Sequence, residues 1–165
     1  MPDSPPCCTV DASVLIDLHH GGLLTQALRL PYRLSAPDVV IEELTEPDGS
    51  ALVELGLEKA SFSGDQVFEV LQLRVQSGQV STPDLFALVL ARSTKATLLT
   101  GDRVLRQIAE REGIPVRGTL WVLDELVRWG IIDQRKALRA LEKMLAHGSR
   151  LPENECQRRM RRWRA

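Results

Sequence analysis

The sequence lacks the residues that mark several common protein classes. Its only cysteines are Cys7, Cys8 and Cys156, an odd number without a Cys-x-x-Cys pair, so neither a disulfide framework nor a cysteine zinc site is expected. No apolar run approaches the roughly 18 residues that a membrane span needs, and the first six residues do not have the pattern of a secretory signal. Glycine-rich phosphate loops are also absent. These absences favour a cytoplasmic protein with reduced thiols and no membrane contact.

Charge is unevenly distributed along the 165 residues. The net charge is −1, but five arginines fall in the last eight residues, so the body carries about −6 without them. Such a tail is either a solvated helix end or a segment that meets phosphate or an acidic partner. A hydrophobic content of 44% is ordinary for a globular protein of one domain.

Apolar runs and helix-start signals alternate along the chain, which predicts an α/β fold with a parallel sheet covered by helices on both faces. Residues 51–62 are ambiguous and are read as a short helix followed by an extended stretch. The other expected strands are residues 7–10, 32–35 and 96–100, and residues 113–116 are expected to form a loop and a last short strand. The other expected helices are residues 13–24, 37–46, 64–76, 82–91, 102–112, 119–129, 133–147 and 152 onward.

Four short stretches each bring one carboxylate to the end of an apolar strand or to an apolar helix: Asp11, Glu43 (or its neighbour Glu42), Asp84 and Asp102. Taken singly, these acids are explained as helix caps, turn residues or solvated side chains. Asp11 is different because it directly follows a strand that should be buried, where an ionised carboxylate is costly without a partner. Acids gathered at one edge of a sheet suit Mg²⁺ or Mn²⁺, and phosphodiester chemistry is a common use of such a pocket.

These motifs, in this order, resemble the PIN domain: Asp11-Ala12-Ser13 after a strand, Glu43-Leu44 on a helix, Asp84 opening a helix of small and apolar residues, and Leu98-Leu99-Thr100-Gly101-Asp102. Residues 118–132 also resemble the helical end of VapC-type toxins. The resemblance covers about residues 7–132. It implies a three-layer α/β/α fold with a central, mostly parallel sheet of about four to five strands. Residues 1–132 would form the PIN-like domain, and residues 133–165 an added helical segment packed on it.

Carried over by residue, the resemblance implies that Asp11, Glu43, Asp84 and Asp102 are the catalytic, metal-holding acids. Glu43 is preferred to Glu42 because the family places a leucine directly after its glutamate, as Leu44 stands here. Ser13 and Thr100 match positions from which a hydroxyl orients the first acid or a metal-bound water.

The same resemblance implies a metal-dependent endoribonuclease that uses one or two Mg²⁺ or Mn²⁺ ions, and points to the toxin of a toxin–antitoxin pair. Its partners would be an RNA substrate, a small antitoxin protein whose segment fills the cleft, and a second copy of the chain in a homodimer. Arg103 and Arg106 lie close to Asp102 in the sequence. They either bind the RNA backbone or are ordinary surface charges of a helix, and the second interpretation is slightly favoured. His20 and His147 are expected to have structural roles.

Two other functions stay open. The fold can serve as a binding or assembly module with idle acids, which metal binding would distinguish. A metal-dependent phosphatase is a further alternative, but one common class of these enzymes needs a second aspartate two residues after the strand aspartate, where this chain has Ser13.

Overall fold

The computed structural model describes residues 4–165 and contains one sheet of five strands, all parallel. The order of the strands across the sheet is β3-β2-β1-β4-β5. The strands are β1 (Cys7–Val10), β2 (Arg33–Pro37), β3 (Glu58–Ala60), β4 (Thr97–Leu99) and β5 (Val116–Arg117).

Helices follow or connect the strands throughout the described part of the chain, and none of them there is long and apolar enough to cross a membrane. The helices are α1 (Ala12–His20), α2 (Leu24–Ala27), α3 (Asp38–Glu43), α4 (Gly49–Glu54), α5 (Gly64–Gln76), α6 (Thr82–Thr94), α7 (Arg103–Arg111), α8 (Thr119–Arg128), α9 (Gln134–Ala146) and α10 (Glu153–Arg164).

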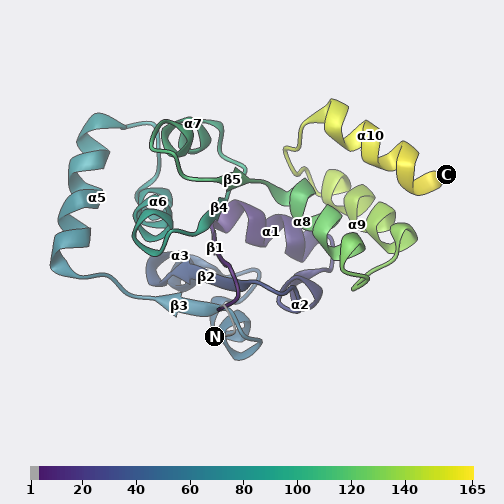
Figure 1. Ribbon diagram of the computed structural model, residues 1–165, viewed down its shortest axis with the longest axis horizontal. Coiled ribbons are helices and arrows are strands. Elements are labelled where there is room, and N and C mark those ends of the chain that lie inside the picture. Colours follow the sequence, from purple (N-terminus) through teal and green to yellow (C-terminus); the bar gives the residue numbers. More distant parts are fainter. Residues whose placement is uncertain (1–3) are drawn as a thin grey trace.

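The sheet is the middle of three layers, with α5, α6 and α7 on one side and α1, α8, α9 and α10 on the other (Figure 1). Each side has its own apolar core, and the two strand-end leucines of β4 show how the sheet divides them. Leu98 packs in the core beneath α6 and α7, whereas Leu99 packs in the core beneath α1 and α8. Successive side chains of a strand point to opposite faces, so one short apolar run supplies both cores.

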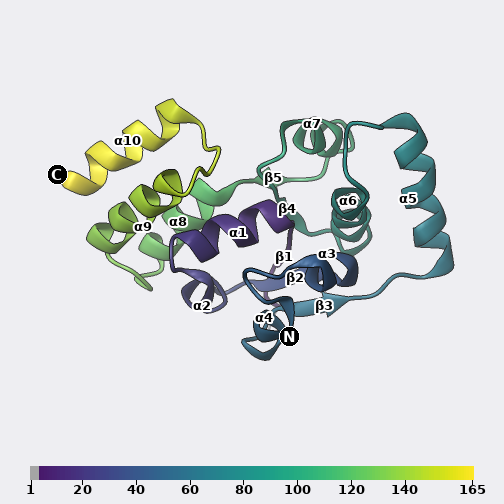
Figure 2. The same cartoon turned by 180° about the vertical axis from the view of Figure 1, so that it is seen from behind.

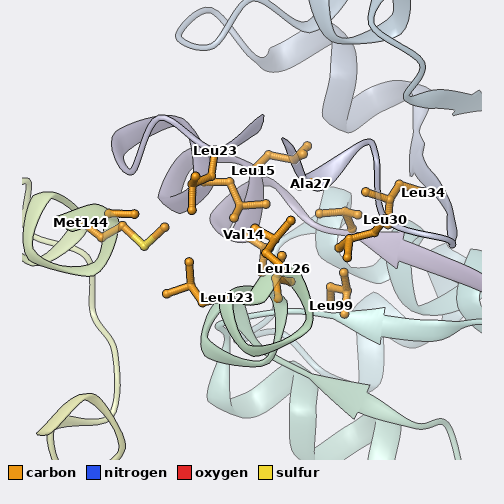
Figure 3. Packing of buried hydrophobic residues seen from close by; sticks show 14 of the residues in the cluster. Val14, Leu15, Leu23, Ala27, Leu30, Leu34, Leu99, Leu123, Leu126 and Met144 are labelled. Atoms are coloured by element: carbon orange, nitrogen blue, oxygen red, sulfur yellow. The ribbon is translucent and has the colours of Figure 1, made fainter. Parts of the chain in front are cut away.

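The larger core joins α1 to the C-terminal helices. Val14 and Leu15 of α1 lie near Leu123 and Leu126 of α8, with Met144 of α9 on the far side (Figure 3). All five side chains are buried. This packing attaches residues 133–165 to the same body as α1 and holds the loop between α9 and α10 close to α1.

The chain reverses its direction across the sheet at β1. It runs from β1 outward through β2 to β3, then returns to the other side of β1 to build β4 and β5. In such sheets ligands bind beyond the carboxyl ends of the strands at this switch point, here between β1 and β4. Val10 pairs with Leu99, so the residues that follow, Asp11 and Thr100, are neighbours at that edge.

The predicted three-layer α/β/α fold is confirmed, and the number of strands is five. Residues 51–62 contain the end of α4 and all of β3, as the pattern suggested. Two details differ. Pro37 ends β2 and caps α3 instead of lying in its first turn. The helix α2 was not predicted, because its four residues are too few to show a helical period and no side chain caps its start.

The arginines of the C-terminal tail are mostly paired within the fold. Arg159 lies 2.7 Å from Asp124 of α8, and Arg162 lies 2.8 Å from the same carboxylate. Arg158 pairs with Glu155 and Arg164 with Glu142 of α9. The pairs of Arg159, Arg162 and Arg164, together with buried Trp163, fasten α10 to the body, whereas the pair of Arg158 and Glu155 lies within α10. The basic charge of the tail therefore serves largely to hold the last helix.

The short helix α4 packs directly against α3, and a glycine makes this close contact possible (Figure 2). Gly49 is buried at the start of α4, and a Cβ placed there would lie 1.9 Å from the carbonyl oxygen of Ile41. Backbone cannot move aside as a flexible side chain can, so α3 and α4 can pack this closely only with glycine at residue 49.

We expect Gly49→Ala to lower the free energy of unfolding by about 1–3 kcal/mol, the usual cost of overpacking. Gly64→Ala is the matched control, because Gly64 also starts a helix but has open space around its Cβ position. It should be neutral or slightly stabilising. Urea unfolding of both variants measures the difference, and equal stabilities would contradict the proposed packing constraint.

Candidate active site

Asp11 is the most buried carboxylate at the switch point, with 1% of its surface exposed. It caps α1, and its Oδ1 accepts hydrogen bonds from the Val14 amide at 3.0 Å and from Ser13 Oγ at 2.7 Å. Its Oδ2 accepts a short hydrogen bond from Thr100 Oγ1. Both carboxylate oxygens are thus held by the chain on either side of the β1–β4 edge.

Burial raises the pKa of Asp11 to about 6, although the hydrogen bonds from Thr100, Val14 and Ser13 lower it. The negative charge of Asp84 raises the same pKa further. The fold thus holds Asp11 in a setting that disfavours its charged form, and a cation in the neighbouring space would favour that form.

The loop after β4 is joined to the turn after β1 by further hydrogen bonds. The Gly101 amide donates to Ser13 Oγ at 3.1 Å, and the Asp102 amide donates to Thr100 Oγ1 at 3.0 Å. Asp102 in turn caps α7 by accepting from the Leu105 amide at 2.7 Å. The two loops therefore form one connected network that fixes the positions of Asp11 and Asp102.

Asp84 lies in the first turn of α6, whose cap is Ser81. Burial raises the pKa of the Asp84 carboxyl, and the negative charge of Asp102 raises it as well. Asp11, Asp84 and Asp102 line one open cleft of about 420 Å³, which we call the acidic cleft. The structure therefore brings together three of the four predicted acids.

The fourth acid lies elsewhere in the structure. Glu43 is exposed on the last turn of α3 and does not line the acidic cleft. Glu42 is also exposed, and it forms an ion pair with Lys59 of β3 at 3.3 Å. The helix α3 does pack against α6, which carries Asp84. The assignment of Glu43, or alternatively Glu42, to the site stays a prediction.

The acidic cleft also contains residues that the sequence did not assign to it. Asp17 of α1 lines it and accepts a hydrogen bond from Thr119 at 2.8 Å. His20 and His147 line it too, with their rings stacked 4.7 Å apart. Asp17 lies one helical turn beyond Ser13, so the helix period offered a signal for it. No sequence signal places His147 there, because its position depends on how α9 packs on α1.

The chemistry of these donors fits a hard divalent cation. No three His, Cys, Asp or Glu side chains between residues 4 and 165 are grouped closely enough to enclose a metal ion. However, Mg²⁺ typically binds through one or two carboxylates and keeps several waters. Asp84 and Asp102, both partly exposed in the cleft, supply carboxylate oxygens of that kind, with Asp11 beside them.

The raised pKa of Asp11 predicts how stability depends on pH. The pKa of Asp11 in the folded protein lies above the ordinary 3.8, so the folded state holds this proton more tightly than the unfolded state. The stability that the protonated carboxyl contributes is therefore fully present below pH 3.8 and is lost as the pH rises through about 6. Asp11→Asn removes this loss. In EDTA, the free energy of unfolding of the variant relative to that of the wild type should therefore be about 1–3 kcal/mol higher at about pH 7.5 than at about pH 4.

Chemical unfolding at the two pH values measures this gain. Asp48→Asn is the control, since Asp48 also caps a helix but is exposed, and it should show no comparable gain. If the stability difference between the wild type and Asp11→Asn did not change with pH, the claim that ionised Asp11 destabilises the fold would be contradicted.

Comparison with known proteins places the chain in a family. No curated protein matches the chain. A chain in the crystal structure of VapBC2 from Rickettsia felis, bound to a DNA fragment from their promoter, is similar with a TM-score of 0.48 and 16% sequence identity, over 68% of this chain and 98% of that one. The family model described as PIN domain matches residues 7–165, so the match includes residues 133–165, beyond the stretch that the motifs covered. The chain belongs to the PIN-domain family.

Proposed function

We propose that this protein is a metal-dependent endoribonuclease that hydrolyses phosphodiester bonds of RNA, and that it acts as the toxin of a toxin–antitoxin pair. The observation that carries the proposal is the meeting of Asp11, Asp84 and Asp102 in one cleft at the switch point of the sheet. Membership in the PIN-domain family supports nuclease chemistry at this place.

The proposed role of the acids is to bind the metal ions. Asp84 and Asp102 would hold one or two Mg²⁺ or Mn²⁺ ions together with Asp11, and Glu43 is proposed as the fourth ligand. Bound divalent ions supply a water of lowered pKa and stabilise the charge on the phosphate and the leaving oxygen. Ser13 and Thr100 hold the Asp11 carboxylate in one orientation. Burial and the negative charge of Asp102 disfavour the ionised form of Asp84, and a bound cation would relieve that cost.

An antitoxin is proposed on the resemblance of residues 118–132 to VapC-type toxins. A segment of that partner would enter the acidic cleft and present an arginine to its carboxylates, since a guanidinium pairs well with carboxylate oxygens. Such a contact would neutralise the charges that the metal otherwise neutralises, and it would keep RNA out.

Calorimetric titration of Mn²⁺ and cleavage of a labelled RNA test the proposal together. We expect Asp84→Asn and Asp11→Asn to lose both metal binding and cleavage. Ser13→Ala should lower activity about 10- to 100-fold, the usual effect of removing a group that orients a ligand. Glu43→Gln should impair cleavage, whereas its matched neighbour Glu42→Gln should not, because the exposed pair of Glu42 with Lys59 contributes little.

Absence of Mn²⁺ binding and of cleavage in the folded wild type would contradict the nuclease proposal and favour an idle binding module. Cleavage of a phosphomonoester but not of RNA would instead favour a phosphatase. Cleavage retained in Asp11→Asn would remove this carboxylate from the mechanism.

We also propose a homodimer. The outer helix α5 exposes Phe68, Leu71 and Val75, which are 61%, 53% and 88% exposed and lie at the i, i+3 and i+7 positions of one face. A contiguous apolar face of this kind is typical of an interaction surface. Leu71→Glu should shift the protein toward monomer in light scattering, while Arg74→Glu on the same helix is the control. An unchanged mass in Leu71→Glu would exclude this face as the interface.

A further inference from the structure

A second cleft continues from the acidic cleft along the carboxyl edge of the sheet. It has a volume of about 890 Å³ and lies between the ends of β4 and β5, the starts of α7 and α8, and the loop that joins α9 to α10. Gly101 and Arg150 line both clefts. We call it the arginine cleft, because its charged lining residues are one glutamate, Glu155, and five arginines: Arg103, Arg106, Arg117, Arg150 and Arg159.

Only one of the five arginines is neutralised by the fold. Arg159 is held by Asp124 at 2.7 Å and by Glu155 at 3.0 Å. The other four form no ion pair with any residue between 4 and 165. Four uncompensated positive charges around one cleft repel each other, and an anionic ligand would relieve that repulsion.

The contrast with the C-terminal tail makes this arrangement specific. The tail contains five arginines, yet Arg158, Arg159, Arg162 and Arg164 are engaged with carboxylates of the fold. Most of the tail's positive charge is therefore compensated within the fold. Four arginines that form no ion pair within the described part of the chain instead gather around one cleft beside the acidic cleft, on segments that are far apart in the sequence.

The lining of the arginine cleft includes an aromatic side chain. Trp121 of α8 is partly buried there, with its ring 5.6 Å from that of Tyr32. Basic grooves with an aromatic side chain are typical of sites for single-stranded nucleic acid, in which phosphates meet arginines and bases meet a ring. A peptide ligand with acidic residues would use the arginines alone.

We propose that the arginine cleft binds the phosphates of single-stranded RNA on one side of the bond that is cut in the acidic cleft. This inference rests on the proposed nuclease function, and it names the path of the substrate. Arg150 stands at the junction, where it contacts the phosphate next to the cut. Because Arg150 comes from the loop after α9, the segment of residues 133–165 takes part in substrate binding and not only in packing.

The test measures RNA binding separately from cleavage. A fluorescein-labelled oligouridylate is titrated in EDTA, so that no divalent ion is present, and its anisotropy is followed at several salt concentrations. We expect Arg106→Gln, Arg117→Gln and Arg150→Gln each to weaken binding several-fold. Each should also reduce the slope of log K against log salt by about 0.7, the value for one lost phosphate contact on a single strand.

Two matched controls carry the same charge change outside the cleft. Arg111→Gln lies on α7, the helix of Arg106, and Arg139→Gln lies on α9, the helix before the loop of Arg150; both arginines are exposed and neither lines the cleft. They should bind RNA as the wild type does. Thermal unfolding of all variants shows whether each one is folded before its binding is compared.

Equal losses in the controls and the cleft variants would overturn the proposal, since the effect would then be one of overall charge. RNA binding equal to that of the wild type in all three cleft variants would also overturn it. Polyglutamate, titrated in parallel, stands for an acidic peptide ligand, and cleft variants that lose binding to polyglutamate but not to RNA would overturn the proposal too. Arginine-dependent RNA binding without Mn²⁺-dependent cleavage would contradict the nuclease function and leave the binding cleft in place. Mn²⁺-dependent cleavage with an unchanged KM in Arg106→Gln and Arg150→Gln would contradict the cleft alone.

Discussion

The buried carboxylate of Asp11 is the interaction on which the site depends. A charged group with 1% exposure is costly, and the fold offsets part of that cost with hydrogen bonds from Ser13, Val14 and Thr100. These donors come from both sides of the β1–β4 edge, so the strand register that pairs Val10 with Leu99 is also what completes the shell of hydrogen bonds. Stability and site geometry are thus fixed by the same contacts, and the raised pKa of Asp11 reflects a burial cost that the hydrogen bonds do not fully offset.

The C-terminal helices show how one charge type serves two purposes. On α10, arginines meet carboxylates of α8 and α9, and the partly buried Arg159 lies against Asp124 with several hydrogen bonds. A charge that is partly removed from water contributes only when its partner is present, so Arg159 and Asp124 depend on each other. This attachment fixes the loop that carries Arg150. The paired arginines of the tail therefore position an arginine that the fold leaves unpaired within residues 4–165.

Much of this fold could be predicted from the sequence, because the signals were local. The run Cys7–Val10 followed by Asp11 indicates a strand and a helix cap, and Ser81 before α6 acts as the expected cap. The parallel arrangement follows from the alternation of strands and helices, and it implies that Asp11 and Asp102 share an edge. Local patterns were sufficient wherever one residue had one dominant role.

Predictions were weaker where a position depends on packing between distant segments. Glu43 was chosen from the residue that follows it, but its place relative to the cleft depends on how α3 and α4 pack around Gly49. His147 and Arg150 reach the clefts only because α9 lies against α1, more than a hundred residues away in the sequence. Likewise, an arginine count locates charge along the chain, whereas the ion pairs of the fold decide which charges are free.

The two clefts have opposite charge and share Gly101 and Arg150 at their boundary. A phosphate backbone that followed both would be attracted by the arginines and repelled by Asp11, Asp84 and Asp102. Divalent ions at the carboxylates would remove that repulsion, and the bound phosphates would in turn strengthen ion binding, because such coupling is reciprocal. Incomplete enclosure of a cation by the side chains of residues 4–165 then fits the proposed nuclease function, because a bound RNA phosphate would contribute oxygen ligands at the boundary between the clefts.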